Sequence, residues 1–358
     1  MERSSGILLP ISSLPSAYGI GTLGKAAYEF ADFLKASGQK YWQVLPLGPT
    51  SYGDSPYQSF STFAGNPYFI DLDMLVEEGL LTKKDIEKEN WGTNPRYVDY
   101  GQIYTSRFKV LEKAKKKGYK DALGELSYFK KNNPWVENYA LFMALKKRFG
   151  QLSWQEWPEE DIRLHEKAAV EKYTKELSED IELFEFIQYL FFKQWTKLKK
   201  YINDLGIEII GDLPIYVALD SCDVWAEPQF FSLDEENYPV EVAGVPPDYF
   251  SEDGQLWGNP CYDWKALKKD NYRWWIRRIE GAAKLYDVLR IDHFRGFAGY
   301  YTIPFGMPDA RIGEWRVGPG WNLFKEINKE CKNAKIVAEN LGFLTPDVNE
   351  LLDKCGYP

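Results

Sequence analysis

The feature that most constrains this chain is an alternation of short β-rich runs with amphipathic helical stretches. The β-rich runs are residues 6–9, 41–45, 208–211, 287–291 and 335–338. The helical stretches are residues 25–36, 181–203, 272–285 and 323–331, and a last helix begins after Thr345 and stops at Gly356. Such alternation predicts parallel strands joined by right-handed crossovers, and hence an α/β sheet or barrel.

The connections favour the barrel. Every link from a helix to the next strand is short, whereas the links after the strands, 46–180, 212–271 and 292–322, are long. Elaboration at the carboxyl ends of parallel strands is typical of (β/α)8 enzymes, so we expect a TIM barrel with large insertions after its strands. No G-x-G-x-x-G follows a strand, which argues against a dinucleotide-binding sheet.

The domain organisation follows from this fold class. The length of 358 residues alone suggests two domains, but α/β barrels often exceed about 150 residues as one unit. We expect one catalytic barrel over residues 1–358, with insertions at 47–99 near the cleft, 100–206 as a mostly helical subdomain, and 213–271 as a loop region. Because five strands are readable and a barrel needs eight, we expect a barrel incomplete at its C-terminus, cut off after about five βα units.

Composition limits the partners. The chain carries 44 Lys and Arg against 53 Asp and Glu, a net charge of −9, which disfavours nucleic acid and anionic membranes. The chain has 13 Trp, 24 Tyr and 21 Phe, and their flat faces suit ligands that stack.

Cysteines and histidines are few. Four cysteines without a C-x-x-C pair and two histidines argue for free or buried thiols rather than disulfides or zinc. No secretory apolar segment is readable near the N-terminus, so we expect a cytoplasmic protein.

Three of the predicted strands are followed by an acid: Asp212, Asp292 and Glu339. In a barrel, side chains at these ends converge on the mouth where the chemistry is placed. The alternative is that the acids cap helices or pair with nearby cations. Convergence of all three is difficult to explain by packing, so we expect a carboxylate-based active site.

The residues around two of these acids indicate their roles. Arg290 and Asp292 lie two apart and should share a strand face, so we expect the cation to lower the pKa of Asp292 and keep it ionised as a nucleophile. Glu339 has no adjacent basic residue and suits a proton donor. Two carboxyls about 5–5.5 Å apart define a retaining glycoside mechanism. His293 follows Asp292 directly, and its position leaves open whether the imidazole faces the pocket or is structural.

Five longer segments resemble a known family: GDSPYQSFSTFAGNPYFIDL (53–72), GDLPIYV (211–217), GVPPDYFSEDGQLWGNP (244–260), RIDHFRGF (290–297) and AENLG (338–342). Together they are similar to the 4-α-glucanotransferases of glycoside hydrolase family 77, also called amylomaltases or disproportionating enzymes. The resemblance runs from the first strand to the last helix.

The resemblance implies roles for individual residues. Asp292 matches the family's nucleophile and Glu339 its acid/base, in agreement with the reasoning from the residues themselves. The substrate-binding residues that it implies are Tyr57, Asp212, Arg290, His293, Tyr249, Phe250, Gln255, Trp257 and Asn340. Tyr249, Phe250, Gln255 and Trp257 belong to segment 244–260, which resembles the loop that covers the family's cleft.

The resemblance also implies an activity. We expect transfer of α-1,4-glucan segments from maltooligosaccharides, amylose, glycogen or starch to the 4-hydroxyl of another glucan, without metal or organic cofactor. Two rival interpretations are a retaining α-glucan hydrolase of the α-amylase type and a non-catalytic glucan-binding protein.

One family feature has no counterpart in the sequence. The family's third catalytic carboxylate lies in a T-H-D motif. The histidine other than His293 in this sequence is His165, and it is followed by Glu166 rather than by an aspartate. The family's glucan-binding loop near the C-terminus is missing as well. These departures leave open an inactive glucan-binding fragment, and we expect the 358 residues alone to show no appreciable transferase activity.

Overall fold

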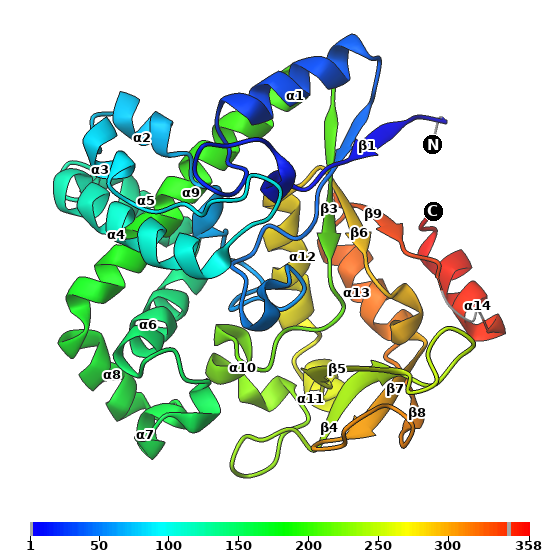
Figure 1. Ribbon diagram of the computed structural model, residues 1–358. Helices are drawn as coiled ribbons and strands as arrows, with labels where there is room; N and C mark the ends of the chain where they lie inside the picture. The colour runs from blue at the N-terminus through cyan, green and yellow to red at the C-terminus, as the bar shows by residue number, and fades with distance from the viewer. Residues whose placement is uncertain (1–2, 342–344) are drawn as a thin grey trace. The chain divides into compact units, whose positions relative to one another are not determined.

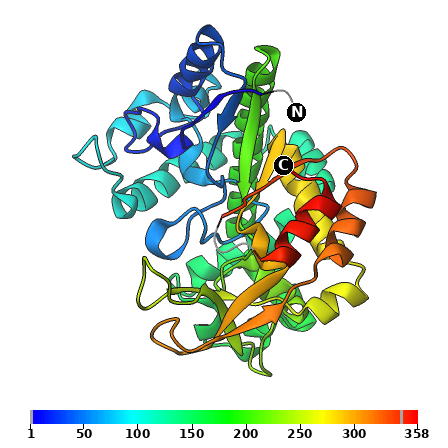
Figure 2. The same cartoon turned by 90° about the vertical axis from the view of Figure 1, so that its right-hand side faces the viewer.

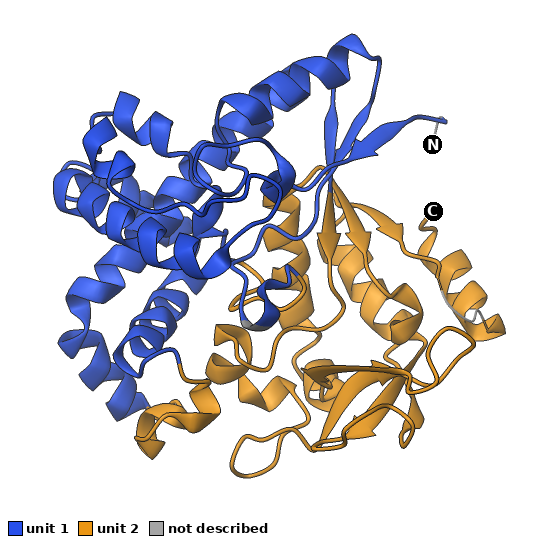
Figure 3. Ribbon diagram, in the orientation of Figure 1, with its two compact units in different colours: residues 1–56, 64–151, 167–210 blue, residues 57–63, 152–166, 211–358 orange. Residues whose placement is uncertain are grey.

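The computed structural model describes residues 3–341 and 345–358, so the last residue of segment 338–342 lies outside the described residues. The chain forms two compact units (Figure 3). Unit 1 comprises Met1–Pro56, Ala64–Gln151 and Lys167–Ile210, and unit 2 comprises Tyr57–Phe63, Leu152–Glu166 and Gly211–Pro358.

The strands of unit 1 are parallel, as the sequence predicts. β1 (Gly6–Leu8), β2 (Tyr41–Gln43) and β3 (Glu208–Leu213) pair in that order, with Tyr41 opposite both Gly6 and Glu208. β3 starts in unit 1 and ends in unit 2. It is longer than the predicted strand, so Asp212 lies within the strand rather than after it.

Unit 1 is otherwise helical and is built around α9 (Ser178–Asp204), against which five other helices pack (Figure 1). These are α1 (Lys25–Ala36), α4 (Tyr100–Gly118), α5 (Leu123–Asn132), α6 (Trp135–Arg148) and α8 (Lys167–Glu176). The apolar residues that predict α9 are all buried: Phe184, Ile187, Phe191, Trp195 and Leu198. The short elements are η1 (Ile11–Ser13), η2 (Tyr52–Asp54), η3 (Pro67–Phe69), α2 (Leu72–Glu77) and α3 (Lys83–Glu87).

Two buried glutamines of α9 hold the segment before α2 by its main chain. Gln188 accepts a hydrogen bond from the N–H of Gly65 at 2.8 Å and donates one to its carbonyl at 2.9 Å. Gln194 does the same with Asp71, at 2.7 and 3.0 Å. Each glutamine side chain therefore forms the two main-chain hydrogen bonds that a neighbouring strand would form, although the segment it holds is not a strand.

Unit 2 contains the end of β3 and two further parallel strands. β6 (Val288–Ile291) pairs with β9 (Lys335–Ala338) from Val288↔Lys335 to Ile291↔Ala338. The N–H of Asp292 donates to the carbonyl of Leu213, which joins the ends of β3 and β6. Helices α12 (Arg273–Leu285), α13 (Trp321–Glu330) and α14 (Pro346–Cys355) lie side by side (Figures 1 and 2). All five predicted parallel strands are thus confirmed.

A second, antiparallel sheet in unit 2 is not predicted from the sequence. Its strand order is β5 (Gln255–Pro260), β4 (Glu241–Val245), β7 (Gly299–Pro304) and β8 (Glu314–Val317). The remaining elements of unit 2 are short: η4 (Trp154–Glu156), α7 (Glu160–Arg163), α10 (Cys222–Ala226), η5 (Pro228–Phe230), α11 (Trp264–Lys269) and η6 (Phe294–Phe297).

The abundant aromatic residues mainly build the interior. Several tryptophans are fully buried: Trp42, Trp154, Trp195, Trp225, Trp274 and Trp275. The expectation that the aromatic side chains offer their faces to a stacking ligand is therefore wrong for these residues. Among the described residues, no helix has both the length and the apolar character that a membrane crossing requires.

Candidate active site

A single guanidinium group lies at the centre of the candidate site in unit 2. Arg290 of β6 donates from Nη1 to Asp212 Oδ1 at 2.6 Å and to Asp292 Oδ1 at 3.3 Å, and from Nη2 to Glu339 Oε1. The three acids come from the ends of β3, β6 and β9. The predicted convergence of these carboxylates is therefore observed, and Arg290 and Asp292 do share a face.

The expected net shift in the pKa of Asp292 is wrong in direction, although the effect expected of Arg290 has the right sign. Burial raises the pKa of Asp292 to about 7, and a hydrogen bond with Glu339 and the negative charges of Glu339 and Asp212 act in the same direction. Arg290 lowers this pKa, but it is the smallest contribution. Asp292 and Glu339 therefore form a hydrogen-bonded pair that retains a proton up to about neutral pH.

Asp212 bonds the same guanidinium and is almost fully buried, with 1% of its side chain exposed. Its other oxygen, Oδ2, accepts a hydrogen bond of 2.7 Å from the hydroxyl of Tyr57. Burial raises the pKa of Asp212, against the opposing effects of Tyr57 and Arg290. The structure thus brings Tyr57 to the site through a bond to a carboxylate that also holds Arg290.

His293 occupies a bend immediately after β6. Its backbone is left-handed, with φ 50° and ψ 47°, and its N–H donates to Glu339 Oε2 at 2.7 Å. Its ring meets that of Trp257 edge-on, with centroids 4.9 Å apart. Burial and the nearby Arg295 lower the pKa of His293 to about 4, so the imidazole is neutral near pH 7.

The remaining predicted binding residues have contacts or exposed positions away from Arg290 and the three carboxylates. Tyr249 and Phe250 lie between β4 and β5, are 99% and 94% exposed, and contact each other edge-on. Gln255 accepts a hydrogen bond from the indole N–H of Trp257. Asn340 is exposed. Within the segment 244–260, the ring of Trp257 contacts that of His293.

Two polar residues that sequence reasoning missed anchor the strand that carries Trp257. Gln58 donates to the carbonyl of Trp257 at 3.3 Å and to Asn259 Oδ1 at 3.1 Å. The buried Asn259 in turn donates to the carbonyl of Val217 at 2.8 Å. Both residues lie within segments that resemble the family, 53–72 and 244–260, but no role was predicted for either of them.

A third missed residue is the buried Arg278 of α12. Its guanidinium donates to the carbonyls of Pro214 and Ile215, which follow β3, and to the hydroxyls of Thr62 and Tyr262. It also lies against the ring of Trp275 at 4.8 Å. This cation therefore fixes the chain just after Asp212.

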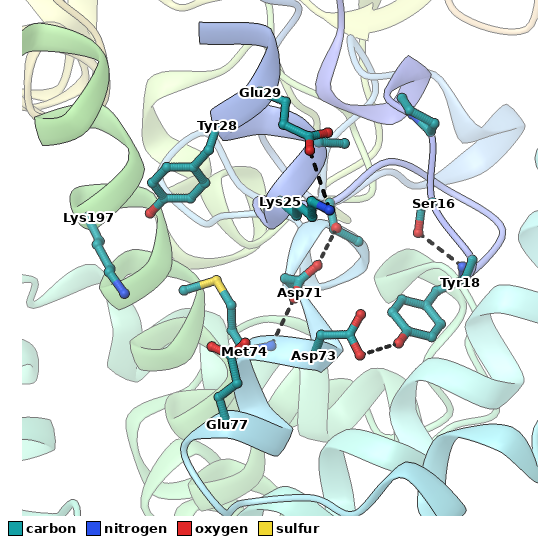
Figure 4. Close-up of a pocket in the computed structure, with 14 residues that line it drawn as sticks. Ser16, Tyr18, Lys25, Tyr28, Glu29, Asp71, Asp73, Met74, Glu77 and Lys197 are labelled. Carbon is teal, nitrogen blue, oxygen red and sulfur yellow. Dashed lines mark hydrogen bonds and ion pairs between the residues drawn. The ribbon is translucent and has the colours of Figure 1, made fainter. Parts of the chain in front are cut away.

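A separate pocket of about 480 Å³ lies in unit 1 (Figure 4). It is lined by residues of the segment 15–18 and of α1, α2 and α9, and none of the predicted site residues lines it. Several of its acids are already bonded, as Tyr18 donates to Asp73 and Thr22 to Asp71. The chemistry-bearing carboxylates are therefore in unit 2.

A mixed α/β protein with a hydrogen-bonded carboxylate pair on one arginine has the groups that a retaining glycoside-processing enzyme uses. Residues 9–358 match the family model for the 4-alpha-glucanotransferases of glycoside hydrolase family 77. The chain belongs to this family, which confirms the resemblance seen in the five segments.

Individual relatives support this membership. A 4-alpha-glucanotransferase of Clostridium butyricum is 52% identical over 350 residues, which cover 97% of this chain and 72% of that protein. One from Streptococcus pneumoniae serotype 4 is 51% identical over 361 residues, covering 100% and 71%. The amylomaltase from Streptococcus agalactiae, solved in complex with acarbose, has a TM-score of 0.97 and 47% identity, covering 100% of this chain and 72% of that one.

Proposed function

We propose that the protein acts as a 4-α-glucanotransferase through a covalent glycosyl-Asp292 intermediate, with Glu339 as the acid/base. The observation that carries this proposal is the hydrogen-bonded pair of Asp292 and Glu339 on Arg290. The placement of both carboxyls on one guanidinium supports a retaining mechanism, because inverting enzymes separate them by about 6.5–9.5 Å.

The first half-reaction cleaves the donor. Glu339 gives its proton to the glycosidic oxygen as the bond from this oxygen to C1 breaks, and an Asp292 oxygen forms the new bond to C1. The shared proton of the free pair is the one this step needs, and it must reside on Glu339 when the sugar enters. Arg290, which contacts both acids, keeps them in place during this change.

The second half-reaction transfers the segment. The carboxylate of Glu339 takes the proton of an acceptor 4-hydroxyl, the acceptor oxygen bonds to C1, and the bond between C1 and Asp292 breaks. The positive charge that develops at C1 in both steps is stabilised by the surrounding carboxylates.

The proposed substrate is an α-1,4-glucan, supported by the acarbose bound to the related Streptococcus agalactiae amylomaltase. The residues we propose to bind it are Tyr57, Asp212, Arg290, His293, Tyr249, Phe250, Gln255, Trp257 and Asn340. The exposure of Tyr249 and Phe250 supports a role on incoming glucan, since exposed aromatic rings stack on sugars and exclude water from the intermediate.

Incubation with maltotriose tests the activity. A transferase yields a ladder of longer maltooligosaccharides, whereas a hydrolase yields reducing ends without longer products. Binding of maltotriose without either product would favour the non-catalytic alternative and overturn the proposal.

Two substitutions test the assigned roles. Glu339→Gln should lower kcat by about 10²–10⁴, the usual contribution of a general acid/base. Asp292→Asn should abolish transfer and prevent trapping of a covalent glycosyl-enzyme, which mass spectrometry of the quenched protein measures. Unchanged turnover in Glu339→Gln would refute the assignment.

We further propose the finer fold class, in which the five parallel strands belong to a (β/α)8 barrel with insertions at 47–99, 100–206 and 213–271, and a cytoplasmic location. The parallel strands with acids at their carboxyl ends support the barrel. The location is supported by the thiols of Cys222, Cys261, Cys331 and Cys355, which are all unpaired, as expected in a reducing compartment.

A further inference from the structure

The bend at His293 links two parts of the site that are far apart in sequence. Its main-chain N–H donates to Glu339 Oε2 at 2.7 Å, while its ring meets Trp257 on β5. One residue thus contacts both the proposed acid/base and the segment proposed to cover the cleft.

The backbone conformation of His293 depends on its surroundings. A left-handed conformation is unfavourable for a residue with a Cβ, although histidine adopts it more often than most residues. The N–H that Glu339 accepts belongs to the peptide that enters this bend. A backbone that relaxed to negative φ would shift the peptides on either side of His293 and disturb the hydrogen bond.

The ring of His293 is confined on two sides. Trp257 lies on one side, with ring centroids 4.9 Å apart. On the other side, a Cβ added to Gly296 would come within 3.0 Å of the His293 ring. Because Gly296 has no side chain, the imidazole fits between this backbone and the indole, and this fit opposes relaxation of the bend.

The main chain of Trp257 is also held in place by hydrogen bonds. Gln58 donates to its carbonyl, and Gln58 also bonds Asn259, which is fixed to Val217. Gln58 directly follows Tyr57, whose hydroxyl bonds Asp212. The position of the indole is therefore set by the same segment that carries a proposed sugar-binding residue.

We infer that His293 is a positioning residue that makes the orientation of Glu339 depend on the position of Trp257. Resting on the proposed function, this inference assigns His293 a role besides sugar contact. When Trp257 lies against the imidazole, the bend is held and Glu339 accepts the N–H. When the indole leaves, the bend relaxes and Glu339 is held by Arg290 alone, so proton donation to the leaving oxygen becomes less effective.

The charged groups around this path are few. Arg290, Asp292 and Asp212 act on Glu339, and Arg295 acts on His293. The imidazole itself stays neutral near pH 7, so its contribution comes from shape and from the main-chain N–H rather than from charge.

Two donors that differ in leaving-group acidity isolate this effect. In 4-nitrophenyl and 4-methoxyphenyl α-maltotriosides the aglycones have similar size, but 4-nitrophenolate leaves without protonation whereas 4-methoxyphenol needs a proton from Glu339. The ratio of kcat/KM for the nitrophenyl donor to that for the methoxyphenyl donor, measured with the full-length protein, therefore reports acid assistance. Loss of sugar binding or partial unfolding lowers both values together and leaves the ratio unchanged.

Five single variants and one double variant test the inference. Glu339→Gln raises the ratio most, by about 10²-fold or more. His293→Ala and Trp257→Leu each raise it by about tenfold, and combining them adds little, since both remove the same contact. His293→Asn, which tolerates a left-handed backbone better than alanine, gives an intermediate ratio. Tyr249→Ala, on the same covering segment but without contact to His293, leaves the ratio at the wild-type value.

The outcomes separate the inference from the proposed function. An unchanged ratio in Glu339→Gln would refute the acid role of Glu339 itself. A raised ratio in Glu339→Gln together with unchanged ratios in His293→Ala and Trp257→Leu would overturn the positioning role and leave His293 a sugar contact. Additive effects of the two substitutions would show that Trp257 acts by another route. If His293→Ala fails to fold, Trp257→Leu on the half-exposed β5 still decides.

Discussion

At the scale of residues, the site shows how neighbours from other strands decide the charge of a side chain. Arg290 is the nearest sequence neighbour of Asp292 on the shared face, and its positive charge alone would lower the pKa of Asp292. Burial, Glu339 and Asp212 reverse that result. Which acids converge could be predicted from their places after strands, but the degree of burial and the hydrogen bond within the pair depend on the packing of three strands.

The pKa of Asp292 has a consequence for stability. Its value of about 7 in the folded protein exceeds the ordinary 3.8, so the folded state binds the proton more tightly, and stability falls as pH rises from about 4 through 7. Asp292→Asn removes this cost. We expect the variant to melt at a higher temperature than the wild type at pH 8, and by a smaller margin at pH 5.

Thermal unfolding at both pH values provides the measurement. His293, with a folded pKa of about 4 below its usual 6.5, works in the opposite direction and lowers stability as pH falls, but it does so in both proteins and largely cancels in the comparison. An equal shift at pH 5 and pH 8 would show that Asp292 is not protonated in the folded pair.

At the scale of elements, the parallel strands were predictable and the antiparallel sheet was not. Each parallel strand is a β-rich run after a helical stretch, so local sequence indicates it. β4 and β5 lie in a segment rich in glycine and proline that is typical of loops, and β4 pairs with β7, more than fifty residues later in the chain. Long-range pairing leaves no local pattern, which also hid the anchoring roles of Gln58 and Asn259.

The segment between β4 and β5 gives a prediction at this scale. Tyr249 and Phe250 are exposed and pack on each other, so replacing both with alanine should change the melting temperature by less than about 2 °C. We expect the ratio of transfer to hydrolysis to fall, because the acceptor loses apolar contacts and water gains access. Product analysis with maltotriose measures this ratio.

A matched control is Tyr128→Ala in α5. Tyr128 is 73% exposed but lies in unit 1, and we expect no change in the product ratio. A double variant at Tyr249 and Phe250 with wild-type products would exclude these rings from acceptor binding.

At the scale of the whole molecule, periodicity predicts the cores better than it predicts the polar groups within them. The apolar positions of α9 follow from their spacing, whereas the buried glutamines on the same helix are unremarkable in sequence. Gln188 and Gln194 satisfy main-chain groups of a segment more than a hundred residues earlier. Their hydrogen-bond partners can be identified only from the folded structure of unit 1.

Gln188→Leu tests the contribution of this clamp to stability. It leaves the N–H and carbonyl of Gly65 without their partner, at about 1–3 kcal/mol for each buried group. We expect a clear loss in the free energy of unfolding by urea, with kcat unchanged at temperatures where the variant stays folded.

Lys193→Ala on the same helix is the control. Its ion pair with Glu78 is exposed, and such pairs contribute about 0–1 kcal/mol. Equal stability of Gln188→Leu and the wild type would show that water or other groups satisfy Gly65.

The contacts of Arg278 have a consequence for how the loop after β3 can evolve. Its guanidinium recognises the carbonyl oxygens of Pro214 and Ile215, and every amino acid supplies that atom. The side chains of this loop can therefore be substituted without moving the adjacent carboxylate. Substitution of the arginine in α12 would remove these hydrogen bonds. Across homologues, we expect substitutions to accumulate on the held loop and to spare the residue that holds it.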